Sequence, residues 1–461
     1  MNNNDTIFAL GSGHGKSGVA VIRISGDSLA EFAKKIIVPF GSAEGGDRGT
    51  RWGSSRVPTP RHAYFTNLRD DAGEIIDQCV VIYFAAPHSF TGTDIIEIHS
   101  HGAPAVINKI FEFLRGHNMR IATPGEFSRR AFFNNKMDLA DVDGLAALLD
   151  AETDKQRAAA LKSMMGGDSE IYADWRNQML EISAYAAAML DYAPDDLPAN
   201  ISTTITERIK RLYTVISAAL AKYKTARAIT HGINIVLVGE TNVGKSSLFN
   251  RIVGASRAIV SDTPGTTRDV VSINMDIDGF LVNLADTAGL RDTTDSVERI
   301  GIERTNAEIE NADIIIHVIT SSSPLERGGA EQRRGVVPPI TKNEILVVNK
   351  SDTTDLKKIK NAIYVSAKTG EGIPELMNTI KNKIKAVTGN GESVLMINAR
   401  THDLLETAAR ELENAIKKSN GDYDILSEHV RYAADSIGKI LGTIGTEEIL
   451  TAAFSQLCLG K

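Results

Sequence analysis

The glycine-rich segment at 239–246 requires a strand before it and a helix after it. It reads Gly-Glu-Thr-Asn-Val-Gly-Lys-Ser, a G-x-x-x-x-G-K-S pattern that follows the apolar run 233–238 and precedes a helix-like segment. The glycines let backbone N–H groups approach phosphates, Lys245 offers a positive charge to the outer phosphates, and the Ser246 hydroxyl can ligate Mg²⁺. The segment therefore predicts a phosphate-binding loop in a wound α/β sheet.

A second glycine-rich segment, at 11–17, resembles such a loop but differs from it in two respects. The first glycine of the spaced pattern would fall at position 10, which is Leu10. The segment is also followed by the strand-like run 19–25 and not by a helix. We therefore expect a glycine-rich turn there and no phosphate site.

Three further motifs follow at the ends of strand-like runs. In 286–289, Asp-Thr-Ala-Gly, the carboxylate can hold Mg²⁺ through water and the glycine N–H can meet the γ-phosphate. Asp352, in the Asn-Lys-Ser-Asp of 349–352, can accept the two N–H donors on one edge of guanine, a pair that adenine lacks. A backbone N–H in 366–368, Ser-Ala-Lys, can bind guanine O6. Together, in this order, the motifs predict a GTPase domain.

The predicted nucleotide site draws on all of these segments and on the run Asp-Thr-Pro-Gly-Thr-Thr-Arg-Asp at 262–269. In that run Thr267 is the expected second hydroxyl ligand of Mg²⁺, beside Ser246. The residues predicted to contact GTP are Asn242, Val243, Gly244, Lys245, Ser246, Ser247, Ser261, Asp262, Thr263, Pro264, Gly265, Thr266, Thr267, Asp286, Thr287, Ala288, Gly289, Asn349, Lys350, Asp352, Ser366, Ala367 and Lys368.

Two groups that assist hydrolysis in many GTPases cannot be identified among these motifs. Leu290 stands where many GTPases place a glutamine that orients the attacking water, and a leucine cannot do so. An arginine finger is not identifiable either. We therefore expect another residue to position the water and a cation from another source to neutralise the transferring phosphoryl group.

The 461 residues divide into three kinds of sequence, and the length itself predicts two to four domains. Up to about residue 118, short β-rich runs alternate with Gly, Pro and Ser. Residues 119–230 and 388–461 have apolar residues at helical spacing, whereas 231–387 alternates strand-like and helical runs. We expect an α/β domain inserted into a helical domain, with 321–339 as a mobile surface loop. The clearest strand-like runs of the first part are 19–25, 78–84 and 94–100.

Charge and cysteine content restrict the partners and the compartment. With 51 Lys+Arg against 58 Asp+Glu the net charge is −7, which by itself argues against a large polyanion-binding surface. The two cysteines, Cys79 and Cys458, are far apart, so a disulfide framework is not expected and a reducing compartment is. A basic apolar leader and a run of about 18 apolar residues are both missing, so we expect a cytoplasmic protein with no membrane partner.

The chain resembles the tRNA-modification GTPase family MnmE, also called TrmE, over essentially its whole length. The motifs that carry the resemblance are NDTIFAL, VAVIRISG, SFTGTDIIEIHSHG, ATPGEFSRRAFFNNKMDLA, TNVGKSSLFN, SDTPGTTRD, DTAGLRDTTDSVERIGIERT and the terminal CLGK. The resemblance implies a multidomain fold: an N-terminal α+β domain that binds tetrahydrofolate and resembles glycine-cleavage T-protein, a discontinuous α-helical domain, and an inserted α/β P-loop GTPase (G) domain. Their expected bounds are 1–118, 119–230 with 388–461, and 231–387.

The resemblance also implies an activity and partners. The family members are homodimers that work with the FAD protein MnmG and add carboxymethylaminomethyl or aminomethyl groups to C5 of the wobble uridine of certain tRNAs. With a tRNA substrate, the net charge of −7 implies contact through local patches or through a more basic partner.

Further site residues are implied by the same resemblance. Potassium is expected to replace the arginine finger, with Asn242, Ser261, Thr263 and Thr266 as its ligands. Glu298, in the segment VERIG, matches the family's water-positioning glutamate, and Lys245 completes the catalytic pair. GTP and GDP, Mg²⁺ and K⁺ are thus the expected ligands of the G domain.

For the folate, 5-formyl- or methylene-tetrahydrofolate, the family pattern carries over to Arg23, Glu97, Lys136 and Lys461. A pterin can pair with a carboxylate through two hydrogen bonds, and the glutamate tail of a folate suits Arg or Lys. Cys458 is implied to be needed for the modification, in a chemical role left open.

Two other functions remain possible from the sequence. The chain could be a regulatory GTPase in ribosome assembly or stress response, with the flanking domains as docking surfaces. Residues 1–118 could also act as an independent folate-dependent methyltransferase, which ranks last. A transition metal is not assigned to His99 and His101, because a third ligand at suitable spacing is missing.

Overall fold

Two compact units make up the chain. Unit 1 comprises Met1–Ala146, Ser169–Ala173 and Gly438–Lys461, and unit 2 comprises Ala147–Asp168 and Asp174–Ile437. The computed structural model describes residues 5–13, 15–37, 57–198, 200–259, 271–286, 309–320, 343–353, 359–388, 395–418 and 422–443.

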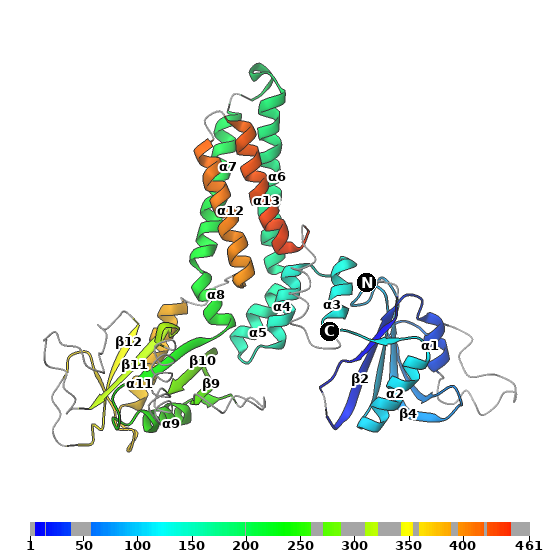
Figure 1. The fold of residues 1–461 in the computed structure, drawn as a ribbon, viewed down its shortest axis with the longest axis horizontal. Helices are drawn as coiled ribbons and strands as arrows, with labels where there is room; N and C mark the ends of the chain where they lie inside the picture. Colours follow the sequence, from blue (N-terminus) through cyan, green and yellow to red (C-terminus); the bar gives the residue numbers. More distant parts are fainter. Residues whose placement is uncertain are drawn as a thin grey trace, which may run out of the picture. The chain divides into compact units, whose positions relative to one another are not determined.

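Unit 1 is built on a six-stranded sheet in the order β3-β4-β5-β2-β1-β6 (Figure 1). Residues alternate between its two faces, so that Ile22 and Ile24 enter the core while Arg23 between them faces the other side. Helices α1 and α2 pack on the core face. The predicted strands at 19–25, 78–84 and 94–100 are confirmed as β2, β4 and β5. The bounds are β1 Ile7–Leu10, β2 Ser17–Gly26, β3 Ala63–Arg69, β4 Ile75–Phe84, β5 Asp94–Gly102, β6 Arg120–Ile121, α1 Ala30–Ile36, α2 Pro104–Gly116, α3 Glu126–Phe133 and α4 Leu139–Leu149.

A partly buried ion-pair network joins Asp5, which precedes β1, and Arg120 of β6 to α3. Arg120 Nη1 donates to Glu126 Oε2 at 2.8 Å, and Arg130 Nη2 donates to Asp5 Oδ1 at 2.8 Å. Thr123 N–H also donates to Glu126 Oε2, at 2.9 Å. Glu126 and Arg130 are 4% and 5% exposed, so each charge depends on its partners. Burial by itself would raise the pKa of Glu126, but the hydrogen bonds from Arg120 and Thr123 and the two guanidinium charges lower it to about 2.

The helices of unit 2 form a bundle in which α6, α7, α12 and α13 lie side by side (Figure 1). Apolar residues at spacings of three and four, such as Ile205, Ile209 and Leu212 of α7, form its buried side. Helix α7 packs along α12, although the whole α/β sheet separates them in sequence. Among the described residues, every helix is too short or too polar to span a bilayer. The bounds are α5 Asp154–Met164, α6 Gly167–Asp191, the 3-10 helix η1 Pro194–Asp196, α7 Ile201–Ala221, α8 Tyr223–Thr230, α12 Ala399–Lys418 and α13 Tyr423–Leu441.

Polar contacts connect the four bundle helices. Arg208 Nη1 of α7 lies 2.8 Å from Glu181 Oε2 of α6. The Tyr423 hydroxyl, at the start of α13, donates to Ser202 Oγ of α7 at 2.8 Å. His429 Nδ1 of α13 lies 2.7 Å from a carboxylate oxygen of α12. Segments before and after the α/β sheet thus form one bundle, which confirms the predicted discontinuous helical domain with an inserted G domain.

The α/β part of unit 2 is a seven-stranded sheet in the order β13-β12-β11-β7-β10-β9-β8. Strands β10, β7, β11, β12 and β13 run parallel, while β9 and β8 pair antiparallel at one edge. The strand-like runs predicted within 231–387 include the parallel strands, and helices α9 and α11 pack against one face of the sheet. The bounds are β7 Ile233–Val238, α9 Lys245–Ala255, β8 Arg257–Ala258, β9 Val271–Ile277, β10 Phe280–Asp286, β11 Ile314–Thr320, β12 Glu344–Asn349, β13 Ile363–Tyr364 and α11 Ile373–Thr388.

Candidate functional site

The predicted phosphate loop connects β7 to α9 at the carboxyl edge of the parallel strands, where α/β sheets bind ligands. Gly239 and Gly244 both have positive φ, +155° and +93°. A Cβ on Gly239 would lie 2.2 Å from Val318 O, and one on Gly244 would lie 2.4 Å from Asn349 Nδ2. Both positions therefore require glycine, for close packing as well as for backbone conformation.

The cation and hydroxyl of the loop are held at the start of α9. Lys245 Nζ donates to the carbonyl oxygens of Gly239 and Glu240 at 2.9 and 2.8 Å. Ser246 Oγ donates to Asp286 Oδ2 at 2.7 Å, which joins the loop to the last residue of β10. The N-terminus of α9 and the ammonium are groups that attract phosphate, and the hydroxyl and carboxylate oxygens are ligands that a divalent cation such as Mg²⁺ prefers.

The guanine motifs lie on β12 and after β13, next to the loop. Asn349 Nδ2 donates to Val243 O at 2.9 Å, and Asn349 Oδ1 accepts from Ala367 N–H at 3.1 Å. One side chain thus connects the phosphate loop to the Ser-Ala-Lys turn. Ser366 Oγ donates to Asp352 Oδ1 at 2.9 Å, so the carboxylate predicted to recognise guanine has a fixed orientation.

Other predicted nucleotide residues take neighbouring places. Lys350 Nζ donates to Asn242 O at 2.8 Å, so Lys350, which follows β12, holds the phosphate loop at Asn242. Ser247 is exposed on the first turn of α9, and Lys368 follows Ala367 in the turn. The predicted residues that lie outside the described residues are Ser261, Asp262, Thr263, Pro264, Gly265, Thr266, Thr267, Thr287, Ala288, Gly289 and Glu298, together with Leu290 and the segment 321–339.

Two of the predicted folate residues meet on the face of the unit 1 sheet opposite α1 and α2. Arg23 of β2 and Glu97 of β5 are paired in register, and Arg23 Nε donates to Glu97 Oε1 at 2.8 Å. His99 Nε2 lies 3.2 Å from Glu97 Oε2, a contact that the sequence analysis missed. The two-residue spacing of 97 and 99 places both side chains on one face and could have revealed it. Their side chains are 33%, 18% and 31% exposed, so a ligand can reach them.

The remaining predicted folate residues are dispersed or outside the described residues. Lys136 follows α3 and lies beside Gly92, where a Cβ would come within 3.2 Å of Lys136 Cε. Lys461 and Cys458 lie outside the described residues. The other cysteine, Cys79, is buried in β4, and burial together with the charge of Asp77 raises its pKa to about 12.

The glycine-rich segment at 11–17 is a turn between β1 and β2, as predicted. Gly11 N–H donates to Val21 O at 2.7 Å, and Ser12 Oγ accepts from Val21 N–H at 3.2 Å. The turn also lies against the candidate folate residues, because a Cβ on Gly11 would come within 3.5 Å of Arg23 Cδ. The sequence did not predict this proximity.

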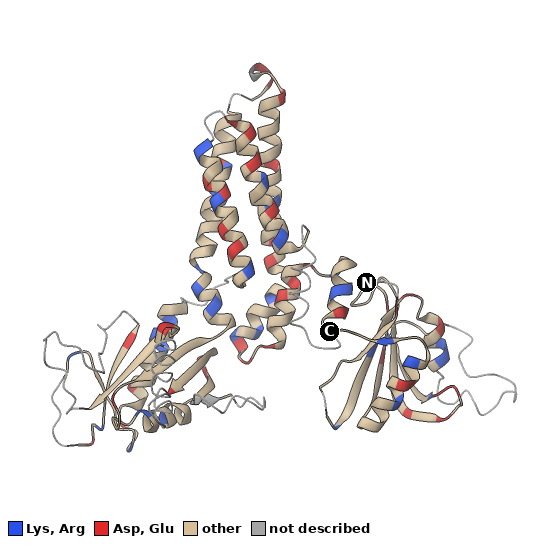
Figure 2. Cartoon of the chain, viewed as in Figure 1, with Lys and Arg blue, Asp and Glu red and all other residues tan. Residues whose placement is uncertain are grey.

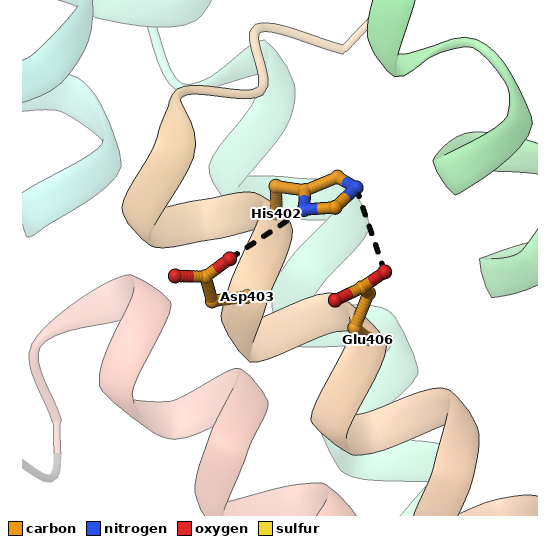
Figure 3. Close-up of side chains that lie close together, drawn as sticks. All are labelled: His402, Asp403 and Glu406. Carbon is orange, nitrogen blue, oxygen red and sulfur yellow. Dashed lines mark ion pairs between the residues drawn. The ribbon is translucent and has the colours of Figure 1, made fainter.

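A histidine with two carboxylates at the start of α12 resembles a metal site. His402 Nδ1 lies 3.6 Å from Asp403 Oδ1 and Nε2 lies 3.9 Å from Glu406 Oε1 (Figure 3). The two imidazole nitrogens face different carboxylates. A histidine ligates an ion through one nitrogen, so only one of these two contacts involves the nitrogen that an ion would use. Both carboxylates are exposed, and the ring stacks on Tyr223 with 4.0 Å between centroids. We assign no metal to this group.

Two solved structures are similar to parts of this chain. The G domain of the Thermotoga maritima FeoB iron transporter is 28% identical, covers 34% of this chain and 98% of its own, and has a TM-score of 0.24. Aquifex aeolicus Era Y63A bound to GDP and AlF4⁻ is 22% identical, covers 39% of this chain and 66% of its own, and has a TM-score of 0.26.

Family models and curated relatives match nearly the full chain. A model described as the GTP-binding protein TrmE N-terminus matches residues 6–136, and one described as the MnmE helical domain matches 139–458. The tRNA modification GTPase MnmE of Brucella anthropi is 37% identical over 99% of this chain and 98% of its own. That of Agrobacterium fabrum is 39% identical over 99% of both chains. By these matches, together with the phosphate loop and guanine motifs at one sheet edge, the chain belongs to the MnmE (TrmE) family of tRNA modification GTPases.

Proposed function

We propose that this chain hydrolyses GTP and that hydrolysis serves the modification of the wobble uridine of tRNA. The observation that carries the proposal is the arrangement at the carboxyl edge of the unit 2 sheet. Lys245 and Ser246 hold the phosphate end, Asp352 and Ser366 hold the base end, and Asn349 connects the two. Asp352 selects guanine because its carboxylate accepts the N1 and N2 donors, which adenine does not offer.

The oxygen donors near the phosphate loop fit Mg²⁺. The Ser246 hydroxyl and the Asp286 carboxylate lie 2.7 Å apart, and both are the hard oxygen ligands that Mg²⁺ prefers. Ser246 and Thr267 would ligate the ion, and Asp286 would hold one of its waters. When bound, the ion neutralises charge on the phosphates. Lys245 adds a second positive charge, and Glu298 would orient the attacking water.

Potassium is the proposed substitute for an arginine finger, bound by Asn242, Ser261, Thr263 and Thr266. Asn242 supports this assignment because its position is constrained: its φ is +63° and its carbonyl accepts from Lys350 Nζ at 2.8 Å. The Asn242 backbone therefore has a fixed position in the loop, and its side-chain oxygen is available there to a cation of matching size.

GTP hydrolysis should be at least about tenfold faster in K⁺ than in Na⁺ at equal ionic strength, because a cation that stands in for an arginine finger contributes a large part of the rate. Initial rates of phosphate release in KCl, NaCl and choline chloride measure the effect. Asn242→Ala should remove the difference between K⁺ and Na⁺ while the Na⁺ rate stays close to that of the parent protein. Equal rates in the three salts would refute the potassium assignment.

The proposed tetrahydrofolate site lies on the face of the unit 1 sheet opposite α1 and α2, around Glu97. Glu97 has one carboxylate oxygen near Arg23 and the other near His99, and each oxygen retains a lone pair for a further donor. A pterin presents two adjacent N–H groups that match such a carboxylate. Arg23, Lys136 and Lys461 would then be available to the negatively charged tail, and the bound folate would supply the one-carbon unit.

The purified protein is expected to bind 5-formyl-tetrahydrofolate, and Glu97→Gln should weaken binding by about ten- to a hundredfold, because one acceptor is replaced by a donor facing the pterin N–H groups. Isothermal titration calorimetry measures the affinity. Asp77→Asn is the matched control, since Asp77 of β4 pairs with His101 of β5 at 2.8 Å in the same sheet but is not proposed to touch the ligand. Equal losses in both variants, or no binding by the parent protein, would rule the site out.

Modification itself is proposed to require Cys458, the FAD protein MnmG, a second copy of this chain and a tRNA. Cys79 supports the choice of Cys458, because a buried thiol with a raised pKa is a poor nucleophile. Figure 2 shows the two signs of charge interspersed along the helices of the bundle. Such a surface is compatible with local contacts to tRNA or with contacts shared with a partner protein. A cytoplasmic location belongs to the same proposal.

The experiment that tests the function is nucleoside mass spectrometry of tRNA from a strain that lacks the gene. Modified wobble uridines should disappear, return with the parent gene, and stay absent with Cys458→Ser. If the modified uridines persist unchanged in the deletion strain, the proposal fails. That result would favour the alternative, a regulatory GTPase in ribosome assembly or stress response. Turnover by residues 1–118 without GTP would instead favour an independent methyltransferase.

The domain bounds 1–118, 119–230 with 388–461, and 231–387 remain proposals. Strand β7 begins at Ile233 and helix α11 ends at Thr388, which supports the bounds of the inserted domain. The N-terminal family model extends to residue 136 and so includes α3. Truncations that end after residue 118 and after residue 136 would show which segment folds independently.

A further inference from the structure

Arg251, on the exposed side of α9, reaches from the phosphate-loop helix to the Ser-Ala-Lys turn. Its Nε donates to Ala367 O at 2.9 Å, and its Nη2 donates to Lys368 O at 2.8 Å. A guanidinium presents its donors in a rigid planar fork, so two bonds to consecutive carbonyls fix both peptide groups at once. The Gly370 backbone lies close to the same side chain, since a Cβ there would be 3.9 Å from Arg251 Cζ.

The direction of these carbonyls determines the direction of the amide between them. In a trans peptide the C=O and the following N–H point to opposite sides. Because the Ala367 carbonyl faces Arg251, the Lys368 N–H faces away from it. The other amides of 366–370 are already used: their acceptors are Glu371 O for Ser366, Asn349 Oδ1 for Ala367, Ser366 Oγ for Thr369 and Ser366 O for Gly370. Within the described residues, the Lys368 N–H has no acceptor of its own.

We propose that Arg251 is a positioning residue for guanine recognition, which by holding the Ala367 and Lys368 carbonyls directs the Lys368 amide toward O6 of the base. The inference rests on the proposed binding of GTP. Under this proposal two groups recognise guanine, and a different side chain holds each of them in place. Asp352, held by Ser366, accepts the N1 and N2 donors, whereas the turn, held by Arg251, donates to O6.

Two features of the geometry favour this role over a general contribution to stability. Arg251 is exposed, so its replacement creates no buried cavity and leaves no buried charge unpaired. Arg251 also belongs to α9, the helix that begins at Lys245. The helix that would hold the phosphates therefore sets the position of the base-binding turn as well. Without the Arg251 guanidinium, the Ala367 and Lys368 carbonyls would hydrogen-bond to water instead. The Lys368 N–H would then no longer point in a fixed direction.

The test compares three nucleoside diphosphates that differ on the two edges of the base. Affinities of GDP, IDP and 2-aminopurine riboside diphosphate are measured by calorimetry on the full chain with Mg²⁺. IDP lacks only the 2-amino group that Asp352 reads. The 2-aminopurine nucleotide lacks O6 and with it the N1 proton, so it loses the contact to the turn and one contact to Asp352. In the parent protein both should bind more weakly than GDP. The missing N1 contact is common to the parent protein and the variants, so a change in the preference for GDP over the 2-aminopurine nucleotide reports on O6.

Arg251→Ala should reduce the preference for GDP over the 2-aminopurine nucleotide by about five- to tenfold, the size of one hydrogen bond, and leave the preference for GDP over IDP unchanged. Arg251→Gln keeps one donor without the charge and should restore part of the preference. Arg251→Lys keeps the charge without the fork and should restore less.

Each alternative outcome has a distinct meaning. If Arg251→Ala weakens all three nucleotides by the same factor, or leaves the ratios of all three unchanged, the positioning role is refuted. Full restoration by Arg251→Lys and none by Arg251→Gln would also refute it, because charge and not geometry would then be responsible. If the parent protein binds ADP as tightly as GDP, the proposed GTPase function itself is refuted. The affinity ratios measured on the Arg251 variants do not test that function.

Discussion

Asp352→Asn is expected to lower the affinity for GTP by about a hundred- to ten-thousandfold and to make xanthosine triphosphate the preferred nucleotide. Two charge-assisted hydrogen bonds from guanine N1 and N2 are lost, and each contributes roughly 1.5–3 kcal/mol. Xanthine carries an oxygen in place of the 2-amino group, and the new Asn amide can donate to it. The Ser366 hydroxyl can still donate to the Asn oxygen, as it does to Asp352 Oδ1 at 2.9 Å, so the orientation is kept.

Equilibrium titration of fluorescent GTP and XTP analogues measures the switch. Asp352 is exposed, so the substitution should leave the fold intact. Glu375→Gln is the control: it removes one negative charge from the exposed first turn of α11 in the same domain and should change neither affinity. An equal loss of affinity for both nucleotides would mean that Asp352 supports the turn and does not read the base.

Glu126→Gln is expected to destabilise unit 1 by about 3–5 kcal/mol, because removing one partner of a buried ion pair leaves the other charges uncompensated. Arg130 is only 5% exposed and Arg120 makes two hydrogen bonds to the Glu126 carboxylate. Hydrogen exchange of peptides from β1 and α3 follows this unit within the whole chain. Asp5→Asn is the matched control, since Asp5 is 36% exposed and should cost far less. Equal protection in Glu126→Gln and the parent protein would contradict the assignment.

The same carboxylate should make unit 1 sensitive to acid. The folded pKa of Glu126, about 2, lies below the unfolded value of about 4.3. Its contribution to the free energy of unfolding, about 3 kcal/mol at 1.36 kcal/mol per pKa unit, is therefore complete above about pH 5 and is lost as the pH falls toward 2. Glu126→Gln lacks this carboxyl group. The difference in stability between the parent protein and Glu126→Gln should shrink over that window, and a constant difference would refute the pKa assignment.

The local parts of the nucleotide site could be predicted from the sequence because the necessary residues are consecutive. The loop 239–246 contains its own glycines, cation and hydroxyl, and its flanking strand and helix have clear periodicities. The roles of Asn349 as a connection between loop and turn, and of Ser366 as the partner of Asp352, depend on how β12 and β13 pair. Which distant strands pair with one another cannot be predicted from the residues of any single segment.

Long-range polar contacts were the part that the sequence analysis missed. Asp5, Arg120, Glu126 and Arg130 meet because β1 and β6 pair in parallel, and their spacing in the chain gives no hint of this. Arg251 has the pattern of an ordinary solvated helix residue. Helix α2 was also not predicted, although its buried Ile110, Phe113 and Leu114 follow helical spacing. The four potassium ligands, Asn242 among them, stay predictions, as do the roles of Glu298 and Cys458.

The insertion of the G domain also sets an order for biosynthesis. Helix α7 must wait for its partner α12 until the ribosome has completed the whole α/β sheet, because the two helices lie on opposite sides of it in sequence. Helices α8 and α11, at the two ends of the insert, pack together, so a folded sheet brings the halves of the bundle close and reduces the entropy lost when they join. A substitution that slows folding of the G domain should therefore leave α6 and α7 exposed to aggregation or proteolysis on the nascent chain, even when it touches no bundle residue.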